Sequence, residues 1–220
     1  MENIKQFVID YIEGRISPVT FENALETDPR VSDWLQGLVP QGMLVNERVP
    51  ETGLYVKVPY TIQKMCRKYE HLDEGGPKGT PAYHFYVHDE IAKLVMNAYP
   101  DWCLKPDKAL EQNSDLALEV CPEYIDGKEV AENNIIGKIL DSIPTDWPKS
   151  KRKSEAKKRI KEAFHIEGKT YPRWNQPAEW PVFDGRPMKF LRTEKLNTEA
   201  KVHYFIDLQT GSERTVEDYF

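Results

Sequence analysis

The sequence is poor in cysteine and has no long apolar run. Its three cysteines, Cys66, Cys103 and Cys121, are far apart, and none belongs to a CxxC pair. An odd number of widely spaced thiols favours free cysteines in a reducing compartment over a disulfide framework or a zinc site. No stretch is long enough to span a bilayer, and polar residues interrupt the apolar positions between Ile4 and Ile12, where a signal peptide needs a continuous apolar segment. We therefore expect a cytoplasmic protein without a membrane segment.

Signatures of catalysis, metal binding and cofactor binding are also missing. His84 and His88 are four residues apart, but the aromatic segment Tyr83–Val87 predicts an extended strand. In a strand, residues four apart are separated by about 13 Å, which is too far for one metal ion. No sequence context marks any cysteine as a nucleophile, since a free cysteine is usually a small buried hydrophobic residue. We expect no catalytic residue, no metal and no cofactor, although an enzyme without a recognisable motif stays an alternative.

The composition is that of a folded protein. Aromatic residues make up 11% of the 220 residues and include five tryptophans, which compensate for a modest hydrophobic fraction of 40%. The net charge of −6 is unevenly distributed, because residues 149–161 contain eight Lys and Arg and one acid, a local charge of +7. The rest of the chain therefore carries −13, and an acidic body favours a basic partner or simply solubility.

The N-terminal part has the 3.6-residue apolar periodicity of helices. It predicts a helix over residues 2–14, and the pairs Ser17-Pro18 and Asp28-Pro29 are helix start signals for the next two. Further helices are expected over residues 61–69, 89–99, 127–143 and from Ser150 through the basic segment to about residue 165. Residues 41–59 contain Gly42, Pro50, Gly53 and Pro59, and no regular element is expected there.

After Gly168 the periodicity changes to two. Met188–Lys195, Val202–Leu208 and Ser212–Tyr219 alternate as half-buried strands do, and they predict a three-stranded antiparallel meander. Because three strands need a second layer, the proline- and tryptophan-containing segment 172–181 is expected to cover one face. The predicted fold class is α+β: a predominantly helical N-terminal part packed with a small C-terminal antiparallel β-meander. We place the helical region at residues 1–165 and the sheet region at 166–220, with one shared core.

Two surfaces are candidates for binding. Trp174, Glu179 and Trp180 could form a protein-recognition patch, because aromatic side chains concentrate binding energy in interfaces; the alternative is that both indole rings pack under the meander as core. The second candidate is the basic helix at 149–161, whose cations could contact nucleic acid. The acidic remainder of the chain and the lack of aromatics among the lysines favour an ordinary solvated face instead. Its candidate contact residues are Lys151, Arg152, Lys153, Lys157, Lys158 and Arg159.

A set of residues between 144 and 220 occurs in a recognisable order. It comprises Phe164-His165, Pro172-x-Trp174-x-Gln176-x-x-Glu179-Trp180-Pro181, Gly185-x-Pro187-x-x-Phe190, Tyr204-x-x-Asp207 and Thr210-Gly211. This pattern resembles uncharacterised cytoplasmic proteins of Gram-positive bacteria associated with the immunity partners of polymorphic or contact-dependent toxins. Thr193 and Asp218 depart from it, since the resemblance leads us to expect glutamine at both positions.

The resemblance implies a non-enzymatic protein that neutralises a partner toxin by occlusion, and it carries no catalytic residue. The acidic body would steer a basic toxin domain toward the chain. A nucleic-acid-associated regulator that uses the basic helix is the alternative.

Overall fold

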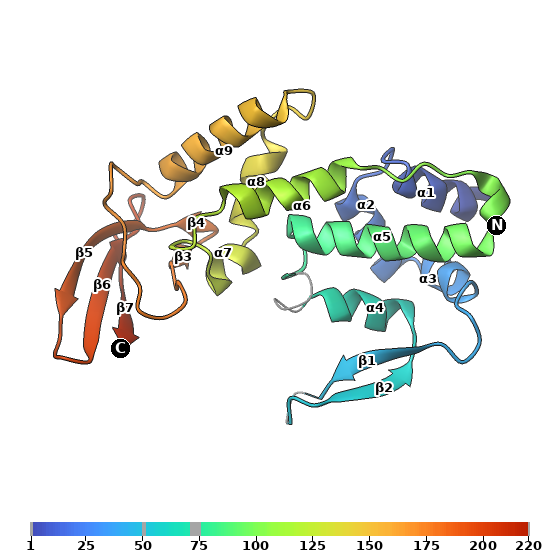
Figure 1. The fold of residues 1–220 in the computed structure, drawn as a ribbon, viewed down its shortest axis with the longest axis horizontal. Helices are drawn as coiled ribbons and strands as arrows, with labels where there is room; N and C mark the ends of the chain where they lie inside the picture. Colours follow the sequence, from blue (N-terminus) through green and yellow to red (C-terminus); the bar gives the residue numbers. More distant parts are fainter. Residues whose placement is uncertain (1, 50–51, 71–75, 220) are drawn as a thin grey trace. The chain divides into compact units, whose positions relative to one another are not determined.

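The fold is α+β, with helices as far as Ala163 and a C-terminal antiparallel β-meander (Figure 1). The computed structural model describes residues 2–49, 52–70 and 76–219. The chain divides into two compact units, residues 1–112 (unit 1) and 113–220 (unit 2). Each unit encloses an apolar cluster of its own, so each is described separately.

Unit 1 begins with the three short helices expected from the sequence. Ser17 Oγ accepts a hydrogen bond from Thr20 N at 3.2 Å, and Asp28 Oδ1 accepts one from Arg30 N at 3.0 Å. Both caps precede a proline in the first turn, where the missing N–H costs nothing. The elements of unit 1 are α1 Glu2–Ile12, α2 Pro18–Thr27, α3 Pro29–Gln36, β1 Leu44–Arg48, β2 Tyr55–Pro59, α4 Ile62–Tyr69, α5 Pro81–Ala98 and the 3-10 helix η1 Pro100–Trp102.

The expectation of a strand at Tyr83–Val87 is wrong. Thr80 caps a helix by accepting from Tyr83 N at 3.3 Å, and α5 runs from Pro81 through both histidines. Val87, Ile91 and Val95 are fully buried at a spacing of four residues, which is the period of a buried helix face. Aromatic residues in the first turns raise strand propensity, but packing on this face decides the conformation.

The region 41–59, expected to be irregular, contains a β-hairpin. β1 and β2 pair antiparallel from Leu44 opposite Pro59 to Arg48 opposite Tyr55. One face of the hairpin is partly covered: Val45 packs against the core of unit 1, and Glu47 forms an ion pair with Lys64 of α4 at 3.2 Å. Alternation in a strand places Leu44 and Tyr55 on the opposite face.

Unit 2 combines the later helices with the meander. Its elements are α6 Ala109–Val120, which spans the boundary between the units, then α7 Lys128–Glu132, α8 Ile135–Asp141, α9 Lys149–Ala163, β3 Val182–Phe183, β4 Arg186–Pro187, β5 Lys189–Lys195, β6 Ala200–Ile206 and β7 Glu213–Tyr219. The single helix expected over residues 127–143 is broken at Asn134, whose φ of 48° lies in the left-handed region. α6 lies in a region for which no helix was named from the sequence.

The three-stranded meander has the predicted order β5-β6-β7, and its strand limits lie within two residues of the expected ones. Phe205 is fully buried on β6 and lies opposite Phe190 of β5. On the same face, His203 lies opposite Thr193 of β5 and Val216 of β7. This face carries the apolar core of the sheet.

The division between the units does not follow the expected boundary at residue 165. Helices α8 and α9 belong to the same apolar cluster as the sheet, because Leu140, Ile160 and Phe164 pack with Trp180 and Phe205. The helices of unit 1 enclose a second cluster. The sheet therefore shares a core with the later helices, and the N-terminal helices have their own.

Candidate functional site

The two tryptophans that were candidates for a recognition patch make hydrogen bonds and ring contacts within unit 2. Trp180 is 0% exposed, and its indole Nε1 donates to Met188 O at 2.8 Å. Phe164 and Phe205 meet its ring edge-on, with centroids 5.2 and 5.5 Å away. Trp174 is half-buried and donates to Tyr124 O at 2.9 Å. The expectation that Trp180 contacts a partner is corrected, since a side chain without exposed surface presents none.

Glu179, the third residue of that patch, is exposed between two buried neighbours. Ala178 packs so close to the start of α7 that a Cβ at Gly127 would lie 2.3 Å from Ala178 O. Glycine at 127 thus lets the proline- and tryptophan-containing segment lie against the helices. The segment therefore packs against α7, and the contacts of Trp174 and Trp180 with Phe205 confirm that it covers the sheet. Of the three candidates, Glu179 is exposed and Trp174 is half-buried.

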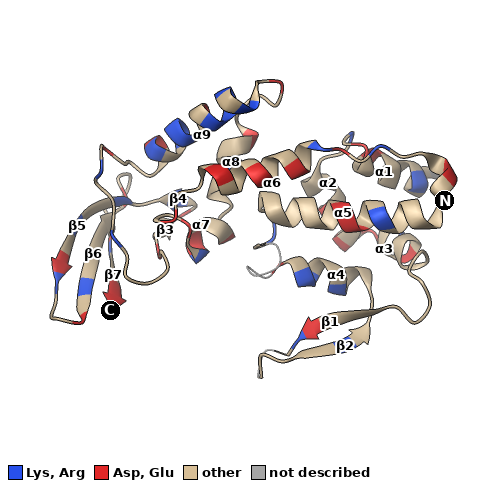
Figure 2. Ribbon diagram, in the orientation of Figure 1, with Lys and Arg blue, Asp and Glu red and all other residues tan. Residues whose placement is uncertain are grey.

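Basic residues are concentrated along α9 (Figure 2), and several of them bind other residues of unit 2. Arg152 is 6% exposed and donates to Asn113 Oδ1 at 2.7 Å, while Lys153 binds Glu119 at 3.0 Å. Arg159 binds both Glu155 and Ser142, and Lys149 shares Glu119. These cations hold α9 to α6 and α8. Glu119 and Glu155 balance two of the four charges, whereas Asn113 and Ser142 are neutral partners.

The remaining cations of α9 are more open. Lys151 lies over the ring of Trp147, 3.4 Å from its centroid, and Lys158 is 3.8 Å from Glu162. Lys157 and Lys161 are exposed. Of the six residues offered for nucleic-acid contact, Lys151, Lys157 and Lys158 thus keep an exposed ammonium, a smaller footprint than the sequence suggested. The nucleic-acid alternative stays a prediction.

The histidines of α5 each have a partner in unit 1. His84 Nδ1 lies 2.6 Å from Glu22 Oε1, and His88 Nε2 lies 2.9 Å from Ile12 O. On a helix the two rings are one turn apart, so the distance argument from an extended strand no longer applies. Among the described residues, no group of three or more His, Cys, Asp or Glu side chains is arranged to hold a metal ion.

The two departures from the sequence pattern both contact His203. Thr193 Oγ1 lies 2.8 Å from His203 Nδ1, and Asp218 Oδ2 lies 3.3 Å from His203 Nε2. A hydroxyl, an imidazole and a carboxylate in this order have the elements of a hydrolase triad. However, Asp218 also accepts hydrogen bonds from the backbone N–H groups of Asn175 and Gln176, and His203 is 0% exposed. These bonds tie the tryptophan-containing segment to the sheet, which is a structural role.

The environment of His203 predicts acid sensitivity of unit 2. Burial lowers the pKa of His203 and outweighs the opposing effect of Asp218, so the folded state holds the imidazole neutral. The unfolded chain, with an ordinary pKa of about 6.5, binds a proton that the folded state excludes. The stability contribution of neutral His203 is therefore present above about pH 6.5 and is lost as the pH falls toward the lowered pKa, at no more than about 1.4 kcal/mol per pH unit.

The measurement is the free energy of unfolding of unit 2 from urea titrations between pH 7.5 and 5. His203→Gln should flatten the decline below pH 6.5. The matched control is His165→Asn, which replaces an exposed histidine with a residue that tolerates its φ of 52°. An equal slope in wild type and His203→Gln would contradict the assignment.

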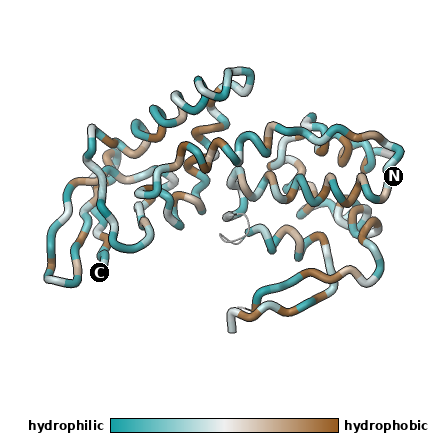
Figure 3. The backbone as a smooth tube through the Cα atoms, viewed as in Figure 1, coloured by the Kyte–Doolittle hydropathy of each residue, from teal (hydrophilic) through white to brown (hydrophobic). Residues whose placement is uncertain are grey.

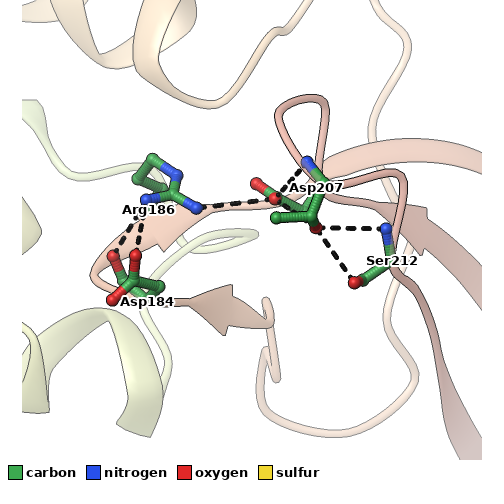
Figure 4. A network of polar contacts seen from close by, with 5 residues as sticks. Asp184, Arg186, Asp207 and Ser212 are labelled. Carbon is green, nitrogen blue, oxygen red and sulfur yellow. Dashed lines mark hydrogen bonds and ion pairs between the residues drawn. The ribbon is translucent and has the colours of Figure 1, made fainter.

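A cavity of about 450 Å³ lies beside Arg186 in unit 2, and we call it the Arg186 cavity. Figure 4 shows Arg186 between Asp184 and Asp207. Its Nη1 donates to Asp184 Oδ2 at 2.8 Å, and its Nη2 is 3.5 Å from Asp207 Oδ2. The cavity is lined by Ile135, Lys138, Ile139, Ser142, Ala163, His165, Gly185, Arg186, Pro187, Asp207, Leu208 and Gln209.

Asp207 anchors the turn between β6 and β7. Its Oδ2 accepts from Thr210 Oγ1 at 2.7 Å and from Thr210 N at 3.0 Å, and Thr210 Oγ1 contacts Ser212 Oγ at 2.9 Å. These bonds from Thr210, with Arg186 in support, hold the pKa of Asp207 below its ordinary value although the residue is 3% exposed. Asp207 is therefore a fixed carboxylate on one wall of the cavity.

The hairpin β1–β2 displays the densest group of exposed apolar side chains in unit 1. Leu54 is 67% exposed, Tyr55 54%, Leu44 53% and Val56 42%. Brown hydrophobic stretches follow both strands in Figure 3. A groove of about 760 Å³ adjoins the hairpin and is lined by Met43, Leu44, Val45, Asn46, Lys57, Tyr60 and by residues of α4 and α5 that include Tyr69, Tyr86 and Lys93. We call the hairpin and this groove the hairpin surface.

The sequence missed both sites. The glycines and prolines of residues 41–59 led to a prediction of irregular structure, although Val45, Val56 and Val58 favour strands. The Arg186 cavity combines residues from four separate segments, and no local pattern identifies it.

Comparisons with known proteins add no identification. No protein-family model, no curated protein and no solved structure matches the chain. The resemblance to immunity partners of toxins therefore stays a prediction. Among the described helices, none is long and apolar enough to cross a membrane.

Proposed function

We propose that this chain is a non-enzymatic cytoplasmic protein that binds a partner protein and neutralises it by occlusion, as the family resemblance implies for a toxin. The observation that carries the proposal is the hairpin surface. A two-stranded sheet is marginally stable by itself, yet this one leaves Leu44, Leu54 and Tyr55 more than half exposed. Large apolar side chains that are exposed on one element are typical of protein interaction sites.

The partner would meet a face of the hairpin. Strand addition at the edge of β2 is disfavoured, because Lys57 lies at the centre of that short strand and Pro59 at its end lacks an N–H. Leu44, Tyr55 and Lys57 share the face that lies opposite Val45 and Glu47. Leu44 and Tyr55 lie near opposite ends of this face, with Asn46 and Lys57 between them, so a partner would offer each an apolar contact of its own.

Charge supports a basic partner. Unit 1 contains 12 Lys and Arg against 17 Asp and Glu, a net charge of −5. A net negative charge speeds association with a basic protein, and high salt weakens this effect because it screens the charges. The three cysteines are free thiols, which supports a reducing compartment.

The proposal predicts that the double variant Leu44→Gln/Tyr55→Gln loses binding. Both side chains are exposed, so folding should be preserved, while truncating two apolar anchors should weaken binding about a hundredfold. The partner to test is the protein encoded next to this gene, with affinity measured by isothermal titration calorimetry and protection measured by growth on co-expression.

The matched control is Leu118→Gln, which removes an apolar side chain that is 77% exposed on α6. It should bind as wild type does. Equal binding by the double variant would exclude the hairpin surface, and absence of both complex and rescue would contradict the occlusion function.

A further inference from the structure

We propose that the Arg186 cavity binds a small organic acid, with the carboxylate at Lys138 and Arg186 and an apolar body against α8 and α9. This site lies in unit 2 and is independent of the hairpin surface. Its volume of about 450 Å³ falls in the range of small-molecule sites. Such sites combine an apolar wall with a few polar groups that fix the ligand's orientation.

The apolar wall comes from four segments. Ile135 and Ile139 of α8 are four residues apart and so lie on one face of that helix, and Ala163 ends α9. Pro187 lies on β4, and Leu208, which is 54% exposed, comes from the turn after β6. An apolar ligand body would bury surface on these side chains that water now contacts.

The charges that line the cavity favour a monoanion. Lys138 and Arg186 are cations, and Asp207 is the one carboxylate among the lining residues. Asp184 binds Arg186 from outside the lining, but its side chain is 77% exposed, so solvent screens this pair. Lys138 forms no ion pair with any described residue. With Asp184 counted, the four charges sum to zero, so a bound carboxylate would pair with the ammonium of Lys138 and would not cancel an excess charge.

Arg186 is partly accessible from the cavity. Its Nη atoms bind Asp184 and Asp207, and its side chain is 32% exposed. Its Nε has no acceptor in the part of the chain that the structure describes, but this atom is buried and offers no contact to a ligand. A carboxylate would meet the exposed part of the guanidinium, whose planar donors match it.

The backbone beside the cavity supports a binding role for His165. Ile166 N donates to Lys161 O and His165 N to Glu162 O, the two bonds of a helix end that usually places glycine at the position of His165. His165 has a φ of 52°, which is unfavourable for a residue with a Cβ. Histidine here places an imidazole on the cavity wall that glycine would not supply, and such strain concentrates at binding sites.

The experiment titrates the ¹⁵N-labelled full chain with hexanoate at pH 7 and follows amide chemical shifts. Hexanamide, an uncharged ligand of the same length, is the matched ligand control. We expect saturable shifts around residues 135–142, 163–166, 185–187 and 207–209, and much weaker binding of hexanamide. Lys138→Gln should weaken hexanoate binding about tenfold, since a hydrogen bond to a charged group is worth about 1.5 kcal/mol or more.

Two further variants complete the test. Lys195→Gln removes an exposed lysine at the end of β5, outside the cavity, and should leave the affinity unchanged. Ala163→Phe should fill the cavity and abolish the shifts; if it does not fold, Lys138→Gln still decides, because Lys138 is exposed and its loss should not affect folding. Equal affinities for hexanoate and hexanamide, or shifts scattered over the surface, would overturn the proposal.

Discussion

Trp180→Ala is expected to destabilise unit 2 by about 3–5 kcal/mol, the usual cost of truncating a fully buried aromatic side chain. The indole has no exposed surface and contacts Phe164 and Phe205, so its loss leaves a cavity at the junction of α9 and the sheet. The variant also leaves Met188 O without its indole donor. Amide hydrogen exchange measured by mass spectrometry should show lost protection in peptides of unit 2, while peptides of unit 1 keep theirs.

Two variants separate packing from hydrogen bonding in this prediction. Trp180→Phe keeps an aromatic ring but removes the donor to Met188 O, and it should cost about 1–3 kcal/mol. Trp147→Ala removes a half-exposed indole that lies under Lys151, and we expect less than half the effect of Trp180→Ala. A Trp180→Ala variant as stable as Trp147→Ala would show that this core is wrongly assigned.

Asp218→Ala should destabilise unit 2 by about 3 kcal/mol, because it removes a buried acceptor from several part-buried donors. Asp218 is 2% exposed and accepts from Asn175 N at 2.8 Å and Gln176 N at 3.1 Å, with Lys201 Nζ 3.2 Å away. Burial alone would raise the pKa of Asp218, but these hydrogen bonds and that of His203 outweigh it and lower the pKa. Its contribution is present above about pH 4 and is lost as the pH falls through the lowered pKa.

Urea unfolding at pH 7 followed by far-UV circular dichroism measures this loss. Asp218→Asn keeps one carbonyl acceptor and should fall between wild type and Asp218→Ala. The control is Asp184→Asn, whose carboxylate is 77% exposed in its pair with Arg186 and should matter by less than about 1 kcal/mol. If both aspartates proved equally important, the anchoring of residues 175 and 176 by Asp218 would be refuted.

The sequence predicted the elements whose signals are local. Ser17-Pro18 and Asp28-Pro29 specify helix starts by capping chemistry alone, and the structure has α2 and α3 there. The three strands of the meander follow from period-two alternation. The strand expected at Tyr83–Val87 failed because aromatic residues suit both a sheet and a buried helix face, and only the neighbours of Val87 distinguish the two.

Site geometry was less predictable than the elements. The sequence left open whether Trp174 and Trp180 form a recognition surface or pack as core, since a tryptophan pattern is the same in both cases. The cations of α9 could be counted, but their pairing with Glu119 and Asn113 brings together residues about thirty to forty positions apart. The Arg186 cavity likewise joins α8, α9 and two turns of the sheet region.

The sequence by itself determined the α+β class, the helix starts, the order of the meander and the covering of that meander by residues 172–181. Tertiary structure alone decided that the chain forms two units, that α6–α9 share a core with the sheet, and that β1–β2 leaves apolar side chains exposed. The physical reason is the distance along the sequence over which each effect acts. Capping, turn chemistry and periodicity act between residues a few positions apart, whereas burial and ion pairing depend on which distant segments meet.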